Sequence, residues 1–330
     1  MKIAVVGLGA IGGLLAARLA AAGHAVSALA RGTTLAAVQA QGLRLRANDG
    51  ETTHRITASD SAATLGPQEL VVVALKGQAL AEAAQGMQPL LGPQTIVMPA
   101  MNGVPWWFLQ TLPKDAAPQD RGLTSVDAGG RIGSSLALER ILGCVVHLTC
   151  ASPEPGVVRH GFGDRLIVGE PAGGASARAT LVRDTLAGAG FTAEASTDIR
   201  HDIWYKLWGN MTMNPVSALT GAETDRILDD PLVHAFILRT MEEAALIGAQ
   251  IGCPIKQTGE ERMAVTRQLG GFKTSMLQDA LAGRALELDA LVSAVREFGE
   301  RVGIATPNID ALLGLTRLMA RVRGLYPGAD

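Results

Sequence analysis

The sequence is poor in the residue types that mark several classes of protein. Of its 330 residues, only 18% are charged, 4% are aromatic and three are cysteines. Three dispersed cysteines do not make a disulfide framework, and no His or Cys pair has zinc-site spacing, so we expect reduced thiols and no metal. A net charge of −2 without a long run of one sign argues against a nucleic-acid partner.

Long apolar runs are also missing. No segment reaches membrane-spanning length without polar residues, and the N-terminal apolar run ends in glycines rather than in a signal-peptide cleavage site. We therefore expect no membrane partner and a cytoplasmic location. Because 48% of the residues are hydrophobic, the chain can bury a large core, and its length suffices for two domains.

The first half of the sequence alternates short β-rich runs with alanine-rich helical stretches. This rhythm predicts an α/β fold with a parallel sheet covered by helices on both faces. Residues 156–170 predict a hairpin around Gly-Phe-Gly-Asp, and residues 113–135 predict a long loop. The expected strands cover residues 2–6, 24–30, 70–75, 95–98 and 142–148, and the expected helices start near Ala10, Thr33 and Gln78.

A glycine turn follows the first expected strand directly. Gly7, Gly9 and Gly12 form G-x-G-x-x-G at the start of a helix. The first glycine permits a tight turn, the second lets backbone approach a pyrophosphate, and the third lets the helix pack close to the strand. The helix N-terminus then offers free N–H groups to the phosphates. We predict a Rossmann dinucleotide-binding domain over residues 1–196, followed by an all-α domain over residues 197–330.

The second expected strand indicates which dinucleotide binds. NAD sites usually place an acidic residue there, but no Asp or Glu precedes Asp49, and Arg31 follows the strand instead. A guanidinium fits a 2′-phosphate, so we predict NADP(H); the alternative is a surface arginine and loose cofactor choice. Lys76 ends the third strand, at the edge where such sheets bind ligands, although a lone lysine there can also be a surface residue.

A polar stripe runs along one face of the otherwise apolar segment 202–219. Lys206, Asn210 and Asn214 are spaced four residues apart, and leaving buried amides unpaired costs about 1–3 kcal/mol each. A polar substrate would satisfy them. A lysine suits reduction of a 2-oxo acid because its ammonium attracts a carboxylate and can protonate the forming alkoxide. The alternative is a lysine that reaches solvent beside two packing amides.

Two further residues have a possible role in binding. Ser275 is a small hydroxyl beside an apolar pair, which could equally cap a helix. Glu287 falls on the core-facing stripe of a helix, where a carboxylate is costly unless it is paired. Lys206 or a substrate hydroxyl could be its partner, or the carboxylate could reach solvent at the helix end.

Taken together, these motifs resemble the ketopantoate reductases (2-dehydropantoate 2-reductases). The resemblance covers nearly the whole chain and depends on the order of its parts. These are GLGAIG, Arg31, Leu75-Lys76, Asn102-Gly103, WYKLWGNMTMNP, SMLQD, and an E-x-D that begins twelve residues after Ser275.

The resemblance implies a Rossmann domain, an all-α domain and NADPH-dependent reduction of ketopantoate to pantoate. Lys206 would be the general acid, and Glu287 would orient substrate and cofactor. Asn102 would contact both ligands, while Asn210, Asn214 and Ser275 would bind the substrate's carboxylate and hydroxyl. The implied cofactor-binding residues are Gly7, Leu8, Gly9, Ala10, Ile11, Gly12, Arg31, Lys76, Asn102, Thr149 (through its backbone) and Glu287.

Three departures from the family pattern concern substrate recognition. Thr224 stands where the family has a substrate-binding asparagine, Trp106 and Trp107 follow Asn102 and would line or cap the pocket, and residues 113–135 are an insertion. They leave open a related NADPH-dependent reductase of a bulkier 2-oxo acid. A dinucleotide-binding regulatory protein without turnover is a third possibility. The sequence allows a homodimer but does not require one.

Overall fold

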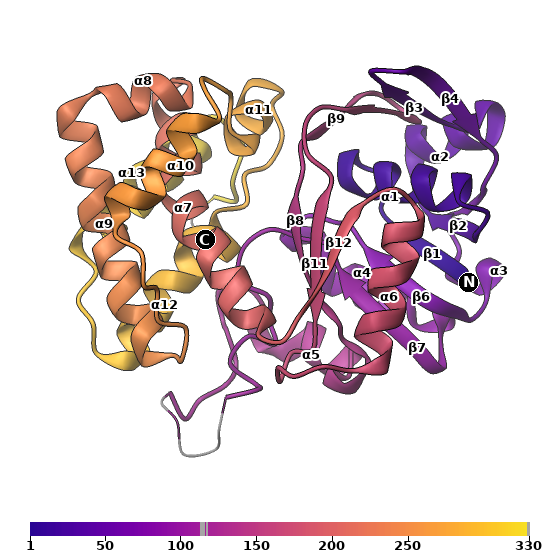
Figure 1. The fold of residues 1–330 in the computed structure, drawn as a ribbon, viewed down its shortest axis with the longest axis horizontal. Coiled ribbons are helices and arrows are strands. Elements are labelled where there is room, and N and C mark those ends of the chain that lie inside the picture. Colours follow the sequence, from indigo (N-terminus) through magenta and orange to yellow (C-terminus); the bar gives the residue numbers. More distant parts are fainter. Residues whose placement is uncertain (113–115, 117, 329–330) are drawn as a thin grey trace. The chain divides into compact units, whose positions relative to one another are not determined.

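The apolar segment after Met1 forms the central strand of the main sheet in the computed structural model, which describes residues 1–112, 116 and 118–328 (Figure 1). The strand order is β5-β2-β1-β6-β7, and every neighbouring pair is parallel. This is the order of a dinucleotide-binding sheet, in which the direction of winding reverses beside the first strand. The strands are β1 (Lys2–Val6), β2 (Ala25–Leu29), β5 (Thr57–Ser59), β6 (Gln68–Val73) and β7 (Leu91–Pro99).

Helices connect these strands, as the alternating pattern predicts. α1 starts at Ala10, and its buried face of leucines and alanines packs against β1 and β2. Val38 is the buried residue of the helix after β2, and Leu80 lies in the one after β6. The elements are α1 (Ala10–Ala21), α2 (Gly32–Gln41), α3 (Ala62–Leu65), η1 (Gly77–Ala79), α4 (Leu80–Gly86) and η2 (Gln88–Leu90).

A second sheet continues from the edge of β7. Val97 and Ile141 form a parallel bridge, and the Leu142 N–H donates to the Val97 carbonyl at 2.9 Å. Because this bridge is parallel, the chain enters the next strand, β8, in the direction of β7, and β8 then pairs antiparallel with β11. The elements are β8 (Gly143–His147), β11 (Arg165–Gly169), α6 (Ala177–Gly188) and β12 (Thr192–Ser196).

The expected hairpin over residues 156–170 is wrong. β10 (Val157–His160) pairs with β3 and β9, whereas β11 belongs to the other sheet. The turn between them is bound by Thr149 instead: the Thr149 hydroxyl accepts the Phe162 N–H at 2.7 Å, and the Gly161 N–H donates to the Thr149 carbonyl at 2.8 Å. The remaining strands of this sheet are β3 (Leu43–Ala47), β4 (Gly50–His54) and β9 (Cys150–Glu154).

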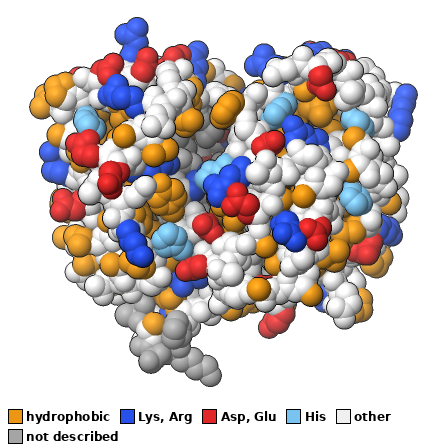
Figure 2. Space-filling model, in the orientation of Figure 1, with side chains coloured by type: hydrophobic (Ala, Val, Ile, Leu, Met, Phe, Trp, Pro, Cys, Tyr) orange, Lys and Arg blue, Asp and Glu red, His pale blue; other side chains and the backbone are white. Residues whose placement is uncertain are grey.

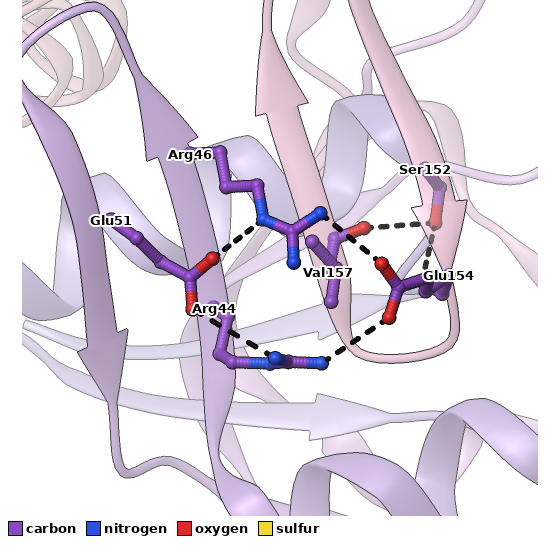
Figure 3. Close-up of polar contacts among 6 residues, drawn as sticks. All are labelled: Arg44, Arg46, Glu51, Ser152, Glu154 and Val157. Carbon is purple, nitrogen blue, oxygen red and sulfur yellow. Dashed lines mark hydrogen bonds and ion pairs between the residues drawn. The ribbon is translucent and has the colours of Figure 1, made fainter.

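Two arginines of β3 belong to an ion-pair network that joins three strands (Figure 3). Arg46 Nε lies 2.5 Å from Glu51 Oε2 on β4, and its Nη1 lies 3.2 Å from Glu154 Oε1 on β9. Arg44 lies within 4 Å of the same two carboxylates. The hydrogen bonds from Arg46 are the main reason why the pKa of Glu51 is lowered. We interpret the network as structural, because it links β3 to β4 and β9 of the same sheet.

The chain divides into two compact units. Unit 1 comprises Met1–Met101 and Gly130–Asp202, and unit 2 comprises Asn102–Gly129 and Ile203–Asp330. The division expected at residue 196 remains a prediction; these units instead divide near Asp202 and group Asn102–Gly129 with the helices. The helices are α7 (Ile199–Thr220), α8 (Thr224–Asp229), α9 (Pro231–Gln250), α10 (Gly259–Gln268), α11 (Ser275–Leu281), η5 (Asp289–Ser293), α12 (Ala294–Val302) and α13 (Pro307–Val322).

Part of the expected loop over residues 113–135 is helical. η3 (Ala128–Gly130) leads into α5 (Arg131–Ser135), and η4 (Leu138–Arg140) follows. Ile132 is buried and α5 packs against α4, so tertiary contacts override the loop-like composition of this stretch. Residues 113–115 and 117 of the expected loop lie outside the described residues.

An aromatic cluster forms part of the core of unit 2. The ring centroid of Phe108 lies 5.8 Å from that of Phe298, 6.1 Å from that of Trp204 and 6.5 Å from that of Trp107. Trp106 and Trp107 are only 2% and 1% exposed, so the expectation that these indoles line a pocket is wrong. The next residue, Phe108, joins this segment to Trp204 of α7 and Phe298 of α12.

The surface charges and the lengths of the helices can both be compared with the expectations from composition. On the face shown in Figure 2, basic and acidic side chains are interspersed with uncharged ones. In the part of the chain that the structure describes, no helix is both long and apolar enough to cross a membrane.

Candidate functional site

The glycine turn after β1 has the geometry that its spacing predicts. Gly7 has φ +93°, and a Cβ there would lie 2.5 Å from Leu75 Cδ2. A Cβ on Gly12 would lie 1.9 Å from the Gly7 carbonyl oxygen. Gly9 differs, because a Cβ on it would meet no described atom within 4 Å. The protein's own packing therefore requires two of the glycines, whereas nothing described packs against the third.

The turn lies where the winding of the sheet reverses. β2 and β6 flank β1, the Gly7 N–H donates to the Leu29 carbonyl, and the Ala74 N–H donates to the Val6 carbonyl. α1 then begins at Ala10, and among the described side chains none caps its N-terminus. Open space at Gly9 and uncapped N–H groups fit the phosphates of a dinucleotide. Leu8, Ala10 and Ile11 complete the expected phosphate-binding turn.

Two further expected cofactor residues, Lys76 and Thr149, lie in unit 1, each just after a strand. Lys76 is half-buried and directly precedes η1 after β6. Thr149 follows β8 and is exposed, but its backbone N–H and carbonyl both bond to the turn at Gly161 and Phe162. Only a second lone pair of that carbonyl remains for a ligand.

Arg31 follows β2 as predicted, and it has an acidic neighbour that the sequence pattern did not reveal. Its Nη1 donates to Glu82 Oε1 of α4 at 2.8 Å. The two side chains are 67% and 72% exposed. No periodic signal links a residue after one strand to a residue in the helix after another, so Glu82 was not predicted to lie here.

In unit 2, the structure brings together two of the predicted catalytic and binding residues. Lys206 lies on α7 and is half-buried, and its Nζ donates to Asn102 Oδ1 at 2.8 Å. The amide oxygen thus fixes the direction of the ammonium. α7 begins at Ile199, and the carboxylate of the preceding Asp198 accepts the His201 N–H at 3.2 Å.

A close backbone contact positions Asn102. The next residue, Gly103, has φ +82°, and a Cβ on it would lie 2.5 Å from the Ala290 carbonyl oxygen. That carbonyl accepts the Val104 N–H at 2.8 Å. Ala290 belongs to η5, a π-helical turn, and such turns are frequent at functional sites. Glu287 is half-buried and lies two residues before η5, so the same contact joins its segment to that of Asn102.

The remaining expected substrate residues lie on α7 and α11. Asn214 is buried, and its Nδ2 lies 3.5 Å from Ser275 Oγ. Thr274, rather than Ser275, caps α11 by accepting the Leu277 N–H, which leaves the exposed Ser275 hydroxyl for other partners. Asn210 is half-buried and lies on α7, one helical turn after Lys206 and one before Asn214.

Thr224 has a structural role. It is fully buried, its hydroxyl donates to the Gly270 carbonyl at 2.9 Å, and the same hydroxyl accepts the Phe272 N–H at 3.1 Å. The residue that departs from the family's asparagine therefore holds the loop before α11 in place.

Models of two related families match the chain. The model described as "Ketopantoate reductase PanE/ApbA" matches residues 3–173. The model described as "Ketopantoate reductase PanE/ApbA C terminal" matches residues 198–320.

Individual relatives are similar over the full length. A protein of Mesorhizobium japonicum named 2-dehydropantoate 2-reductase is 43% identical over 327 residues, which cover 99% of this chain and all of that one. A solved structure from Ralstonia solanacearum MolK2, named provisionally as a ketopantoate reductase, is 57% identical with a TM-score of 0.94, covering 98% of this chain and 99% of its own. D-mandelate dehydrogenase in a ternary structure with NADH and anilino(oxo)acetate is 21% identical with a TM-score of 0.84, covering 98% of this chain and all of its own, and so shares the fold.

Proposed function

The chain belongs to the ketopantoate reductase family, and on this premise we propose that it catalyses the NADPH-dependent reduction of ketopantoate to pantoate. Membership in the family makes the protein an oxidoreductase that acts on a CH–OH/carbonyl pair. The observation that supports a catalytic role most directly is the Lys206 ammonium, which Asn102 orients at 2.8 Å.

We assign cofactor binding to the residues that the resemblance implies. The turn from Gly7 to Gly12 would hold the pyrophosphate, Arg31 the 2′-phosphate and Lys76 a phosphate or ribose, with Asn102, Thr149 and Glu287 as further contacts. The open space at Gly9 supports this fit. When bound, NADPH supplies the hydride. The choice of NADP(H) over NAD(H) is supported by Arg31 and by the absence of any acidic residue in the sequence before Asp49.

We assign the proton transfer to Lys206. As the carbonyl carbon of the 2-oxo acid is reduced, negative charge develops on its oxygen. The Lys206 ammonium stabilises that charge and then donates a proton to it, which leaves pantoate with a neutral hydroxyl. Asn102 holds the ammonium in one orientation, because its amide oxygen accepts a hydrogen bond from one of the Nζ–H groups.

Substrate recognition is assigned to amides and a hydroxyl. Asn210, Asn214 and Ser275 offer hydrogen bonds to a carboxylate and a hydroxyl without adding charge. Asn214 and Ser275 already lie 3.5 Å apart, so one substrate group can bind both. Glu287 would accept from the substrate hydroxyl and orient it.

No specific observation favours the bulkier 2-oxo acid. Trp106 and Trp107 are core residues, and Thr224 bonds to the loop before α11, so neither departure enlarges a binding site. The oriented Lys206 also favours an enzyme over a non-catalytic dinucleotide-binding regulator.

Oxidation of NADPH followed at 340 nm with ketopantoate and a panel of other 2-oxo acids tests this proposal. We expect kcat/KM to be highest for ketopantoate. Higher values for a bulkier acid would reassign the substrate, and cofactor binding without turnover of any acid would favour the regulator.

We further propose a cytoplasmic enzyme of pantothenate synthesis that forms homodimers. The small number of dispersed cysteines in the sequence favours this compartment. Leu315, Leu318 and Val322 form an exposed apolar stripe on α13, which a second copy of the chain can cover. Light scattering should give a dimer that Leu318→Lys dissociates; a monomeric wild type would contradict it.

A further inference from the structure

The contact between Arg31 and Glu82 changes the charge of the expected 2′-phosphate site. The sequence offers no acidic residue before Asp49, yet the fold places the Glu82 carboxylate 2.8 Å from Arg31 Nη1. Glu82 is the only ion-pair partner of Arg31 within the described ranges. The arginine assigned to the phosphate is therefore neutralised by a side chain of the protein.

The position of the pair follows from the strand order. Arg31 comes after β2, and Glu82 lies in the first turn of α4, after β6. β1 lies between β2 and β6. The pair thus joins the segments on either side of the strand whose end forms the glycine turn, at the edge where dinucleotides bind.

The ion pair is weak enough for a phosphate to replace Glu82 as the partner of Arg31. Both side chains are more than two-thirds exposed, and a single guanidinium nitrogen makes the contact. Exposed ion pairs of this kind contribute little and are screened by salt. A phosphate monoester carries roughly two negative charges and binds guanidinium more strongly than one carboxylate does.

We infer that Glu82 is a specificity-determining residue: it competes with the 2′-phosphate for Arg31 and so reduces the preference for phosphorylated over non-phosphorylated dinucleotide. This inference rests on the proposed function. Glu82 weakens binding of the 2′-phosphate in both possible geometries. If the phosphate displaces Glu82, the ion pair is lost; if the phosphate binds the free guanidinium nitrogens, it lies beside a like charge.

Binding of 2′,5′-ADP and 5′-AMP, measured by calorimetry at low salt on the full chain, tests the inference without turnover. Glu82→Gln removes the charge and keeps the shape. We expect it to tighten 2′,5′-ADP by about 2- to 5-fold, the range of an exposed pair, and to leave 5′-AMP unchanged. The gain should vanish near about 1 M salt, where the Debye length is about 3 Å.

Two further variants make the result specific. Asp184→Asn removes one charge from another exposed ion pair of the same unit, Arg183–Asp184 on α6, and should leave both affinities unchanged. Arg31→Ala should abolish the preference for 2′,5′-ADP, and Glu82→Gln added to it should then have no effect, because competition requires the arginine.

The outcomes separate the two claims. Unchanged or weaker 2′,5′-ADP binding in Glu82→Gln, with a wild type that prefers 2′,5′-ADP, overturns the role of Glu82 and leaves the proposed cofactor intact. Weaker binding would mean that Glu82 positions Arg31 instead. A wild type without any preference for 2′,5′-ADP overturns both the inference and the proposed NADP(H) specificity.

Discussion

Gly9 and Gly12 belong to the same turn, but different constraints explain them. Gly12 has no room for a side chain, because its Cβ would lie 1.9 Å from the Gly7 carbonyl oxygen. Gly9 has open space around it and an ordinary φ of −72°. At the residue scale, folding therefore requires the first glycine, and we propose that dinucleotide binding requires the second.

Alanine substitutions separate these two requirements. We expect Gly9→Ala to keep the melting temperature of the wild type while 2′,5′-ADP binds at least about tenfold more weakly, the loss of roughly one hydrogen bond to a charged group. Gly12→Ala should lower the melting temperature, because α1 must move away from β1. Differential scanning calorimetry with and without 2′,5′-ADP measures both effects. Normal binding by Gly9→Ala would show that no ligand approaches the turn there.

At the scale of elements, the start of α13 depends on another helix. Thr306 makes no side-chain cap at this N-terminus, so its first N–H groups need other partners. The buried Glu243 of α9 accepts the backbone N–H groups of Asn308 and Ile309, each at 2.9 Å, and also the Asn308 amide. A carboxylate suits this position because it also faces the positive end of the helix dipole.

Glu243→Gln should therefore destabilise the protein. The amide keeps the shape but loses the charge and one acceptor, so we expect a loss of about 1–3 kcal/mol in the free energy of unfolding. Glu242→Gln is the matched control, since Glu242 is exposed on the same helix and should change that free energy by less than about 0.5 kcal/mol. Urea titrations of both variants measure these free energies. Equal free energies of unfolding for Glu243→Gln and Glu242→Gln would mean that Glu243 does not cap α13.

Local sequence patterns predict some of the secondary-structure elements but not all of them. Short apolar runs predicted β1, β2, β6 and β7 because most of their residues are buried, whereas the three-residue β5 has no fully buried residue and was not predicted. β10 and β11 belong to different sheets, and the turn between them is bound by Thr149, 13 residues from Phe162. The two adjacent buried indoles of Trp106 and Trp107 match neither the helix nor the strand period. These features follow from tertiary packing, which no local period encodes.

At the scale of the whole molecule, the candidate site depends on contacts between distant residues. The resemblance to a family named Lys206 and Asn102 individually, but their hydrogen bond joins positions 104 residues apart. The approach of Gly103 to Ala290 and of Glu82 to Arg31 was not foreseen either. The sequence thus predicts the chemistry of the side chains, and the fold alone determines which of them meet.

Charge distribution also makes the stability of the molecule depend on pH. Hydrogen bonds from Arg178 are the main cause of a lowered pKa at Glu170, with a smaller contribution from Ser176, and burial opposes them. At Glu297, burial would raise the pKa, but hydrogen bonds from Ser125 and Thr124, with Arg301 nearby, lower it overall. Both carboxylates are thus more acidic in the folded state than in the unfolded chain.

The sign of the pH effect follows from linkage. A folded-state pKa below the ordinary value of 4.5 stabilises the protein above that value, and this stability is lost as the pH falls through the folded pKa. We expect Glu170→Gln to be less stable than the wild type at pH 7 and the difference to shrink in acid. Urea unfolding across the acid range measures this. A difference that stays constant with pH would contradict the lowered pKa.

The measurement that tests the central claim most directly is the turnover of ketopantoate with NADPH by Lys206→Gln, beside Lys256→Gln, an exposed lysine of the same unit. If Lys206 is the general acid, kcat should fall roughly 10²- to 10⁴-fold in Lys206→Gln while 2′,5′-ADP binding and the melting temperature stay at wild-type values, and Lys256→Gln should be unaffected. A kcat for Lys206→Gln equal to that of the wild type would contradict the account.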